Sequence, residues 1–184
     1  ERLAHDSGAK HVTGKAVYID DMPEPGGLLH VLPVSSDKAH ARITRLDLSA
    51  VRSFAGVVAV LTADDIAGTN DWGHAGLGDD RVFAGDLVEF AGQVIYAIVA
   101  DSIALARDAA KLAVVEYQEL PVILTVEQAQ KAGSTHLAPR TLSRGDAATA
   151  IRQSEHQMSG RFVSGAQEHF YLETQSARAV PVGR

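Results

Sequence analysis

The segment VIYAIVADSIALARDAAKLAVVEY, residues 94–117, decides the fold class of this chain. Its opening, residues 94–99, is apolar almost without interruption, which is typical of a strand covered on both faces. Asp101 or Ser102 then caps a segment whose small apolar residues keep helical spacing. Residues 114–117 return to a β-branched strand pattern. Strand, helix and strand in this order predict a parallel pair joined by a right-handed crossover, and therefore an α/β fold.

Three more strands are predicted on the N-terminal side of this unit. Residues 28–36 are mostly apolar, and residues 41–48 alternate as in a half-exposed strand. The β-branched run VVAVL, residues 57–61, predicts a short buried strand. A short helix follows it, because Thr62 is a capping residue and Asp65 stands three positions later, where it reaches back to the cap's amide.

The remaining segments up to residue 132 connect and close this domain. Residues 1–25 are polar and rich in glycine and proline, so we expect an extended arm. The glycines and aspartates of residues 68–85 predict a long exposed loop. Thr125 with Gln128 forms a second capping box. We therefore expect one compact domain, with its arm, over residues 1–132.

Residues 133–184 are expected to form a linker and the start of a second domain. The patterns predict a linker at 133–139, a helix at 145–153, and strands at 158–165 and 175–182. The chain starts at Glu1 and stops directly after a strand-like run, so we expect it to be a segment of a longer polypeptide.

Composition excludes several classes of function. A formal net charge of −6 provides no electrostatic footprint for nucleic acid. No apolar run approaches the roughly 20 residues of a membrane-spanning helix. The chain has no cysteine, which excludes disulfides, thiolate zinc sites and iron–sulfur ligation within it and is consistent with a cytoplasmic location.

Most motif searches give no site. The eight histidines never stand three or four residues apart, and there is no HExxH or G-x-S-x-G motif. GLGDDR, residues 76–81, starts like a dinucleotide fingerprint, but Arg81 occupies its sixth position and no helix follows. One stretch is unusual: the nine residues after Gly165, 166–174, gather an amide, two carboxylates, a histidine and two aromatic rings. Taken alone, it is either a structural polar cluster or one wall of an active site.

Six motifs, taken together, resemble the aldehyde oxidase and xanthine dehydrogenase family. They are VTGKAVYIDDMP (12–23), AHARI (39–43), GVVAVLTADDI (56–66), the unit from GQ (92–93) to VAD (99–101), VEYQELP (115–121), and QEHFYLET (167–174) followed by VP (180–181). They cover residues 12–181 in collinear order, and within the family the pattern is most similar to bacterial xanthine dehydrogenase large subunits.

The resemblance implies an architecture and a reaction. Residues 1–132 would form the family's a/b hammerhead domain, and residues 133–184 the first strands of its molybdopterin-binding region. The complete enzyme would hydroxylate hypoxanthine and xanthine to urate with oxygen from water. Molybdenum-molybdopterin would bind the remainder of the large subunit, and electrons would reach NAD through a small partner subunit that holds iron–sulfur clusters and FAD. We expect this segment alone to hold no cofactor and to be inactive.

The resemblance assigns one residue of this chain to the cofactor. Gln167 takes the place of the family's glutamine that donates a hydrogen bond to an oxygen ligand of molybdenum, whereas a plainer interpretation is a buried amide tying two strands together. The catalytic glutamate is expected beyond Arg184, so Glu168 and Glu173 are interpreted as structural supports. Two alternatives remain: oxidation of aldehydes or another N-heterocycle, and a purely structural assembly segment.

Overall fold

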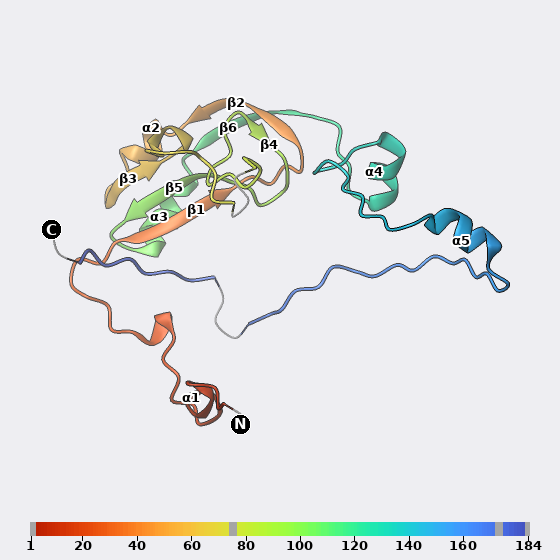
Figure 1. The fold of residues 1–184 in the computed structure, drawn as a ribbon. Helices are drawn as coiled ribbons and strands as arrows, with labels where there is room; N and C mark the ends of the chain where they lie inside the picture. The colour runs from red at the N-terminus through yellow and green to blue at the C-terminus, as the bar shows by residue number, and fades with distance from the viewer. Residues whose placement is uncertain (1–2, 74–76, 172–174, 183–184) are drawn as a thin grey trace. The chain divides into compact units, whose positions relative to one another are not determined.

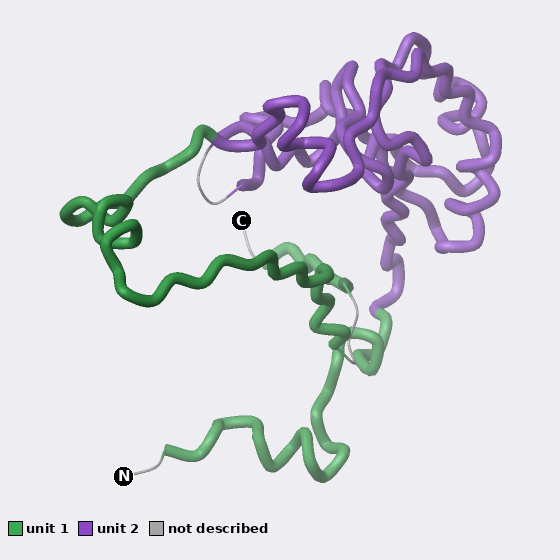
Figure 2. The backbone as a smooth tube through the Cα atoms, turned by 90° about the vertical axis from the view of Figure 1, so that its right-hand side faces the viewer, with its two compact units in different colours: residues 1–24, 138–184 green, residues 25–137 purple. Residues whose placement is uncertain are grey.

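The computed structural model describes residues 3–73, 77–171 and 175–182. The chain divides into two compact units, drawn in different colours in Figure 2. One unit comprises residues 25–137, and the other combines residues 1–24 with residues 138–184. The predicted domain boundary between residues 132 and 133 stays a proposal.

The first sheet of the 25–137 unit is built around one central strand. β5 (Val94–Ala100) lies between β1 (His30–Ser35) and β3 (Val57–Leu61), and both neighbours run antiparallel to it (Figure 1). Ile98 of β5 stands opposite a residue of each neighbour, and most of β5 is buried. The near-continuous apolar pattern therefore correctly predicted a central strand covered on both faces.

The second sheet has the order β4-β2-β6. β2 (Ala41–Asp47) pairs antiparallel with β4 (Leu87–Val88) on one side and with β6 (Val114–Glu119) on the other. Ile43 of β2 stands opposite Tyr117 of β6, and both pack against the core. The predicted strands at 41–48 and 114–117 are thus confirmed.

The predicted parallel pairing between residues 94–99 and residues 114–117 is wrong. β5 and β6 belong to different sheets, and every strand pair in the described residues is antiparallel. Both edges of β5 are already occupied by β1 and β3. The strand–helix–strand pattern fixed the type of each element, but a strand's partner depends on distant segments that local periodicity does not encode.

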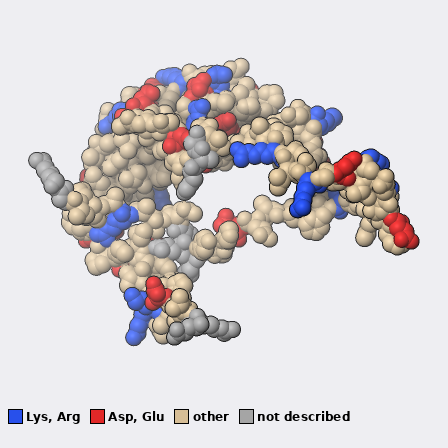
Figure 3. Space-filling view, viewed as in Figure 1, with Lys and Arg blue, Asp and Glu red and all other residues tan. Residues whose placement is uncertain are grey.

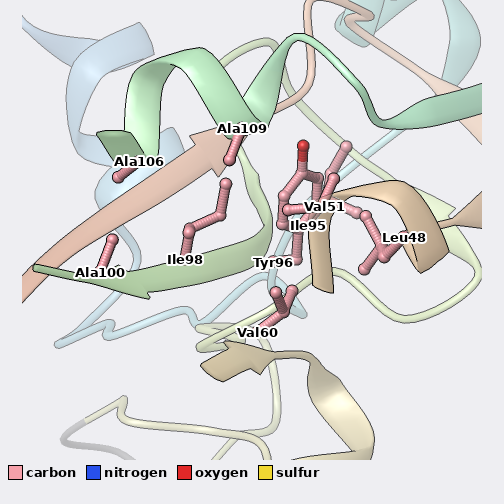
Figure 4. Packing of buried hydrophobic residues seen from close by; sticks show 9 residues of the cluster. All are labelled: Leu48, Val51, Val60, Ile95, Tyr96, Ile98, Ala100, Ala106 and Ala109. Carbon is pink, nitrogen blue, oxygen red and sulfur yellow. The ribbon is translucent and has the colours of Figure 1, made fainter. Parts of the chain in front are cut away.

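Helix α3 (Ile103–Ala110) covers the first sheet. The Ser102 hydroxyl accepts a hydrogen bond from the Leu105 amide at 3.2 Å, so Ser102 is the predicted cap. Figure 4 shows Ala106 and Ala109 of α3 on the side of Ile98 and Ala100 of β5. These small side chains let the helix backbone lie close to the sheet.

The hydrophobic core lies between these layers. It joins β5 and α3 to α2 (Ser49–Arg52), which contributes the fully buried Val51. Tyr96 and Ile98 are among the largest fully buried side chains. Fully burying an aliphatic side chain of this size stabilises a fold by about 1.5–3 kcal/mol. Burial also raises the pKa of the Tyr96 hydroxyl, so this phenol stays neutral.

The segment after β3 contains the predicted capping interaction between Thr62 and Asp65. A single 3-10 turn, η2 (Ala63–Asp65), replaces the expected short helix. The Asp65 carboxylate accepts hydrogen bonds from the Thr62 amide at 2.8 Å and from the Thr62 hydroxyl at 3.0 Å. These bonds lower the pKa of Asp65. β3 itself is less buried than predicted, because it lies at the sheet edge and only Val60 is fully enclosed.

The predicted loop at 68–85 is exposed only in part. Phe83 and Ala84 are buried. The Asn70 side chain makes two hydrogen bonds to the backbone of Phe83. Its Nδ2 donates to the Phe83 carbonyl at 2.8 Å, and its Oδ1 accepts from the Phe83 amide at 3.0 Å. These two bonds pair both backbone polar groups of Phe83, although this buried residue lies outside any strand.

The second capping box is confirmed at α4 (Val126–Ala132). The Thr125 hydroxyl accepts from the Gln128 amide at 3.2 Å, and the Gln128 side chain accepts from the Thr125 amide at 3.2 Å. Gly133, with a φ of 63°, ends the helix in the left-handed conformation that glycine adopts without a Cβ clash.

The other unit contains three short helices among its described residues. They are α1 (Gly8–Val12), the 3-10 turn η1 (Ile19–Asp21) and α5 (Ala147–Gln153). The Asp146 carboxylate accepts from the Thr149 amide at 3.0 Å and caps α5, which confirms the helix predicted at 145–153.

The predicted strands at 158–165 and 175–182 are wrong for their described residues, which lie outside any sheet. Their apolar side chains are largely exposed, Phe162 to 91 %. A strand exists only when a neighbouring strand accepts and donates its ladder of hydrogen bonds, and no such neighbour occurs among the described residues of this unit.

Candidate functional site

The one residue assigned to the cofactor, Gln167, lies on an extended and exposed part of the chain. No hydrogen bond joins its amide to another residue of the described chain. The plainer interpretation, a buried amide that ties two strands together, does not describe this arrangement, because the residue is neither buried nor flanked by strands. The two N–H donors and the carbonyl acceptor of the Gln167 side chain therefore have no hydrogen-bond partner among the described residues.

Phe170, three residues after Gln167, has an unusual backbone conformation. Phe170 has a φ of 52°, and it is the only residue other than glycine with positive φ in the described chain. Its amide donates to Oε1 of Glu168 at 3.3 Å. The rings of His169 and Tyr171 are stacked, with centroids 5.7 Å apart and planes 4° from parallel. Sequence patterns did not predict the positive φ, since Phe170 is neither a glycine nor an asparagine. Glu173 lies outside the described residues.

Arg178 connects the two ends of the same unit. Its Nη1 donates to the Pro23 carbonyl at 3.0 Å, and its Nε is buried without a hydrogen-bond partner. No sequence pattern marks Arg178, because its hydrogen bond to Pro23 joins residues that are 155 positions apart.

The 25–137 unit carries charged groups that pair with one another on its surface. Nζ of Lys38 is 2.7 Å from Oε1 of Glu119, and Arg45 bridges Glu116 and Asp47. The Lys38 hydrogen bond lowers the pKa of Glu119, and the same bond raises the pKa of Lys38. On the face drawn in Figure 3, acidic and basic side chains lie next to one another. Exposed pairs of this kind stabilise a surface modestly and indicate no reaction.

Two open hollows occur in the same unit, and neither gathers reactive groups. One, of about 320 Å³, lies beside β2 and has Arg45, Asp64 and Asp86 in its wall. The other, of about 380 Å³, lies between Phe90 and residues 121–124. Within the described residues, no three histidine, cysteine, aspartate or glutamate side chains are grouped as metal ligands. Across the same residues, no helix has the length and apolar character needed to cross a bilayer.

Two family profiles match successive parts of the chain. The profile of the aldehyde oxidase and xanthine dehydrogenase a/b hammerhead domain matches residues 13–121. The profile of the molybdopterin cofactor-binding domain matches residues 129–184, which include Gln167.

Relatives of both enzyme kinds are about equally similar to this chain. Aldehyde oxidase 1 of Cavia porcellus is 41 % identical over 98 % of the chain, and xanthine dehydrogenase of Drosophila subobscura is 42 % identical over 96 %. The xanthine dehydrogenase/oxidase of Gallus gallus is 39 % identical over 98 % of the chain. The chain spans 13 % of the length of each of these relatives.

Solved structures support the same family. Quinoline 2-oxidoreductase from Pseudomonas putida 86 is 28 % identical with a TM-score of 0.63, and the match covers 84 % of this chain and 21 % of that one. Aldehyde oxidoreductase from Desulfovibrio gigas is 31 % identical with a TM-score of 0.58, covering 67 % of this chain and 15 % of that one. The chain therefore belongs to the aldehyde oxidase and xanthine dehydrogenase family of molybdenum-containing oxidoreductases, and it carries the family's a/b hammerhead domain followed by molybdopterin cofactor-binding sequence.

Proposed function

We propose that this chain is part of a cytoplasmic xanthine dehydrogenase-type enzyme that hydroxylates hypoxanthine and xanthine to urate. Water supplies the oxygen, and electrons pass to NAD through a partner subunit. The observation that carries the proposal is the unpartnered amide of Gln167 within the sequence that matches the molybdopterin cofactor-binding domain. The role of Gln167 is part of the proposal.

The donor chemistry of Gln167 fits the proposed cofactor. An amide N–H donates to an electron-rich oxygen without adding charge, so it orients the group and leaves the group's redox state to its own chemistry. The described structure provides no competing acceptor for this donor. When bound, the molybdenum-molybdopterin group supplies the two-electron oxidation of the substrate carbon.

The remaining tasks of the reaction fall outside this chain in our proposal. The catalytic glutamate and the residues that select the substrate lie beyond Arg184. Iron–sulfur clusters and FAD lie on a partner chain, a division with which the absence of cysteine from these 184 residues agrees. The segment alone then has no hydroxylase activity.

Oxidation of aldehydes is the second candidate. This chain is 41 % identical to aldehyde oxidase 1 of Cavia porcellus and 42 % identical to xanthine dehydrogenase of Drosophila subobscura. The first identity favours aldehyde oxidation as strongly as the second favours purine oxidation. Both reactions would use the same cofactor and the same Gln167 contact. They differ in the groups that bind the substrate.

The experiment compares substrates on the complete, molybdenum-loaded protein. We expect kcat/KM for hypoxanthine and xanthine to exceed the value for aromatic aldehydes by at least about tenfold, which corresponds to a difference of 1.4 kcal/mol in transition-state binding. The reverse ranking would establish the aldehyde oxidase candidate. A molybdenum-loaded protein that oxidises neither class would contradict the proposed function.

A further inference from the structure

The start of the chain belongs to one domain by sequence and to another unit by its contacts. Residues 13–24 fall within the match to the a/b hammerhead profile, which covers residues 13–121. In the structure, however, residues 1–24 form one compact unit with residues 138–184, which the molybdopterin cofactor-binding profile matches. We call residues 13–24 the strap, because they carry hammerhead sequence into the unit that contains the cofactor-binding sequence.

A long-range hydrogen bond reaches the end of the strap. Nη1 of Arg178 donates to the carbonyl oxygen of Pro23 at 3.0 Å, although the two residues are 155 positions apart. Arg178 is partly buried, and its Nε is buried without a hydrogen-bond partner in the described structure. Because part of the guanidinium is shielded from water, loss of the Pro23 acceptor would leave a charged donor with little to replace it. This bond is therefore worth more than an exposed one.

The hydrogen bonds within the strap are local. In η1 the Asp21 amide donates to the Tyr18 carbonyl at 3.1 Å, and the Asp21 carboxylate accepts from the Tyr18 amide at 3.0 Å. No residue of this three-residue turn is buried. A turn of this length is marginal by itself in water, since its first hydrogen bond must fix several backbone dihedrals. The order of the strap therefore depends on contacts with residues outside it.

We propose that Arg178 is the anchor of the strap. Its guanidinium fastens the Pro23 end of residues 13–24 to the molybdopterin cofactor-binding sequence, so the two matched regions are joined by this contact as well as by the chain between them. The inference concerns how the polypeptide is held together. It does not depend on which substrate the complete enzyme oxidises.

Three variants isolate the contribution of the guanidinium. Arg178→Met keeps a long side chain and removes every donor, whereas Arg178→Lys keeps a charge and one donor group. Arg140→Met is the matched control, because Arg140 is an exposed arginine of the same unit and lies outside any helix or strand.

Hydrogen–deuterium exchange with mass spectrometry, on the complete protein, measures how firmly the strap is held. The Asp21 and Met22 amides both donate within η1, so a peptide that contains them reports whether this turn is formed. For Arg178→Met we expect these amides to exchange at least about tenfold faster, because a hydrogen bond from a charged donor no longer holds the adjoining Pro23. Peptides from β5 should exchange at an unchanged rate, since the packed core of the 25–137 unit is intact.

The other two variants separate donation from a general effect of substitution. Arg178→Lys should recover part of the protection of the strap, and Arg140→Met should exchange like the unchanged protein. Equal exchange of the Asp21 and Met22 amides in Arg178→Met and in the unchanged protein would overturn the inference. So would an Arg178→Lys protein whose strap exchanges as fast as that of Arg178→Met. An equal acceleration in β5 would mean that the substitution opens the whole protein, and it too would overturn a local anchor.

Discussion

The two compact units of this chain differ in how deeply their large apolar side chains are buried. In the 25–137 unit, Tyr96 and Ile98 are at most 1 % exposed, and two antiparallel sheets and α3 enclose them. In the other unit, Met158 and Phe162 are more than 90 % exposed. Sequence hydrophobicity alone does not separate the two cases. The difference is that every strand of the first unit finds its partners inside that unit.

The same difference separates the hydrophobic core from the residue to which we assign the cofactor contact. The 25–137 unit encloses its own core, and its charged groups pair on the surface. Gln167 belongs to the exposed segment of the other unit and lies outside any helix or strand. We therefore expect substitutions in the core of the 25–137 unit to lower stability. Substitution of Gln167 should instead change the cofactor chemistry.

Proteolysis gives the largest expected contrast. Trypsin should cut after Arg144 at least about a hundredfold faster than after Arg107, although both side chains are exposed. Arg107 lies in α3 over the core, so its cleavage requires opening of the packed unit, whereas Arg144 precedes α5 on exposed backbone. Timed digestion with mass spectrometry measures both rates. First cleavage within residues 94–117 would contradict the comparison.

Removal of a core side chain should give the second largest contrast between the two units. Ile98→Ala should lower the free energy of unfolding by about 2–5 kcal/mol, because it leaves a cavity between β5 and its neighbours. The matched control is Phe162→Ala, which removes a larger side chain from an exposed position and should change stability by less than about 0.5 kcal/mol. Urea denaturation followed by circular dichroism measures both. Equal losses would mean that Phe162 is buried in solution.

Much of the fold was predictable because it depends on neighbours in sequence. The apolar run of β5, the Ser102 cap and the Thr125–Gln128 box all occur where the pattern placed them. The separation of β5 and β6 into two sheets was not predictable, because β1 and β3 compete for the edges of β5. At the candidate site, likewise, the local motif was predictable and the contacts were not.

Gln167 was assigned through the motif, whereas the positive φ of Phe170 was not predicted. Local preference argues against a positive φ for an aromatic residue, and the Phe170 amide donates to the Glu168 side chain in this conformation. Likewise, the hydrogen bond from Arg178 to Pro23 depends on a partner far away in the chain.

Substitution of Gln167 should change the reaction and leave stability intact. In the complete enzyme, Gln167→Ala removes a hydrogen bond to a polarised acceptor, worth about 1.5–3 kcal/mol, so kcat per bound molybdenum should fall by roughly one to two orders of magnitude. The Tm should be unchanged, since the side chain is exposed and no hydrogen bond joins it to another described residue. Both quantities are measured on one preparation. A lower Tm with normal turnover per molybdenum would refute the assigned role.

The smallest expected effect concerns the pH dependence of the 25–137 unit. The Lys38 hydrogen bond lowers the pKa of Glu119 in the folded state, so this pair's contribution is complete above the unfolded pKa, about 4.3, and is lost as the pH falls through the folded value. The raised pKa of Lys38 sets a limit at high pH. The contribution of Lys38 to stability is complete below its unfolded pKa, about 10.4, and is lost as the pH rises through its folded pKa.

The same pair therefore contributes a constant increment between these limits. The unchanged chain and its Glu119→Gln variant should differ in Tm by a small and constant amount near neutral pH, and the two curves should converge as the pH falls below about 4. High salt should reduce the difference at neutral pH, because both side chains contact solvent. Thermal unfolding at a series of pH values measures the curves. Curves that stay parallel down to pH 2 would mean that the Lys38–Glu119 contact does not distinguish the folded from the unfolded chain.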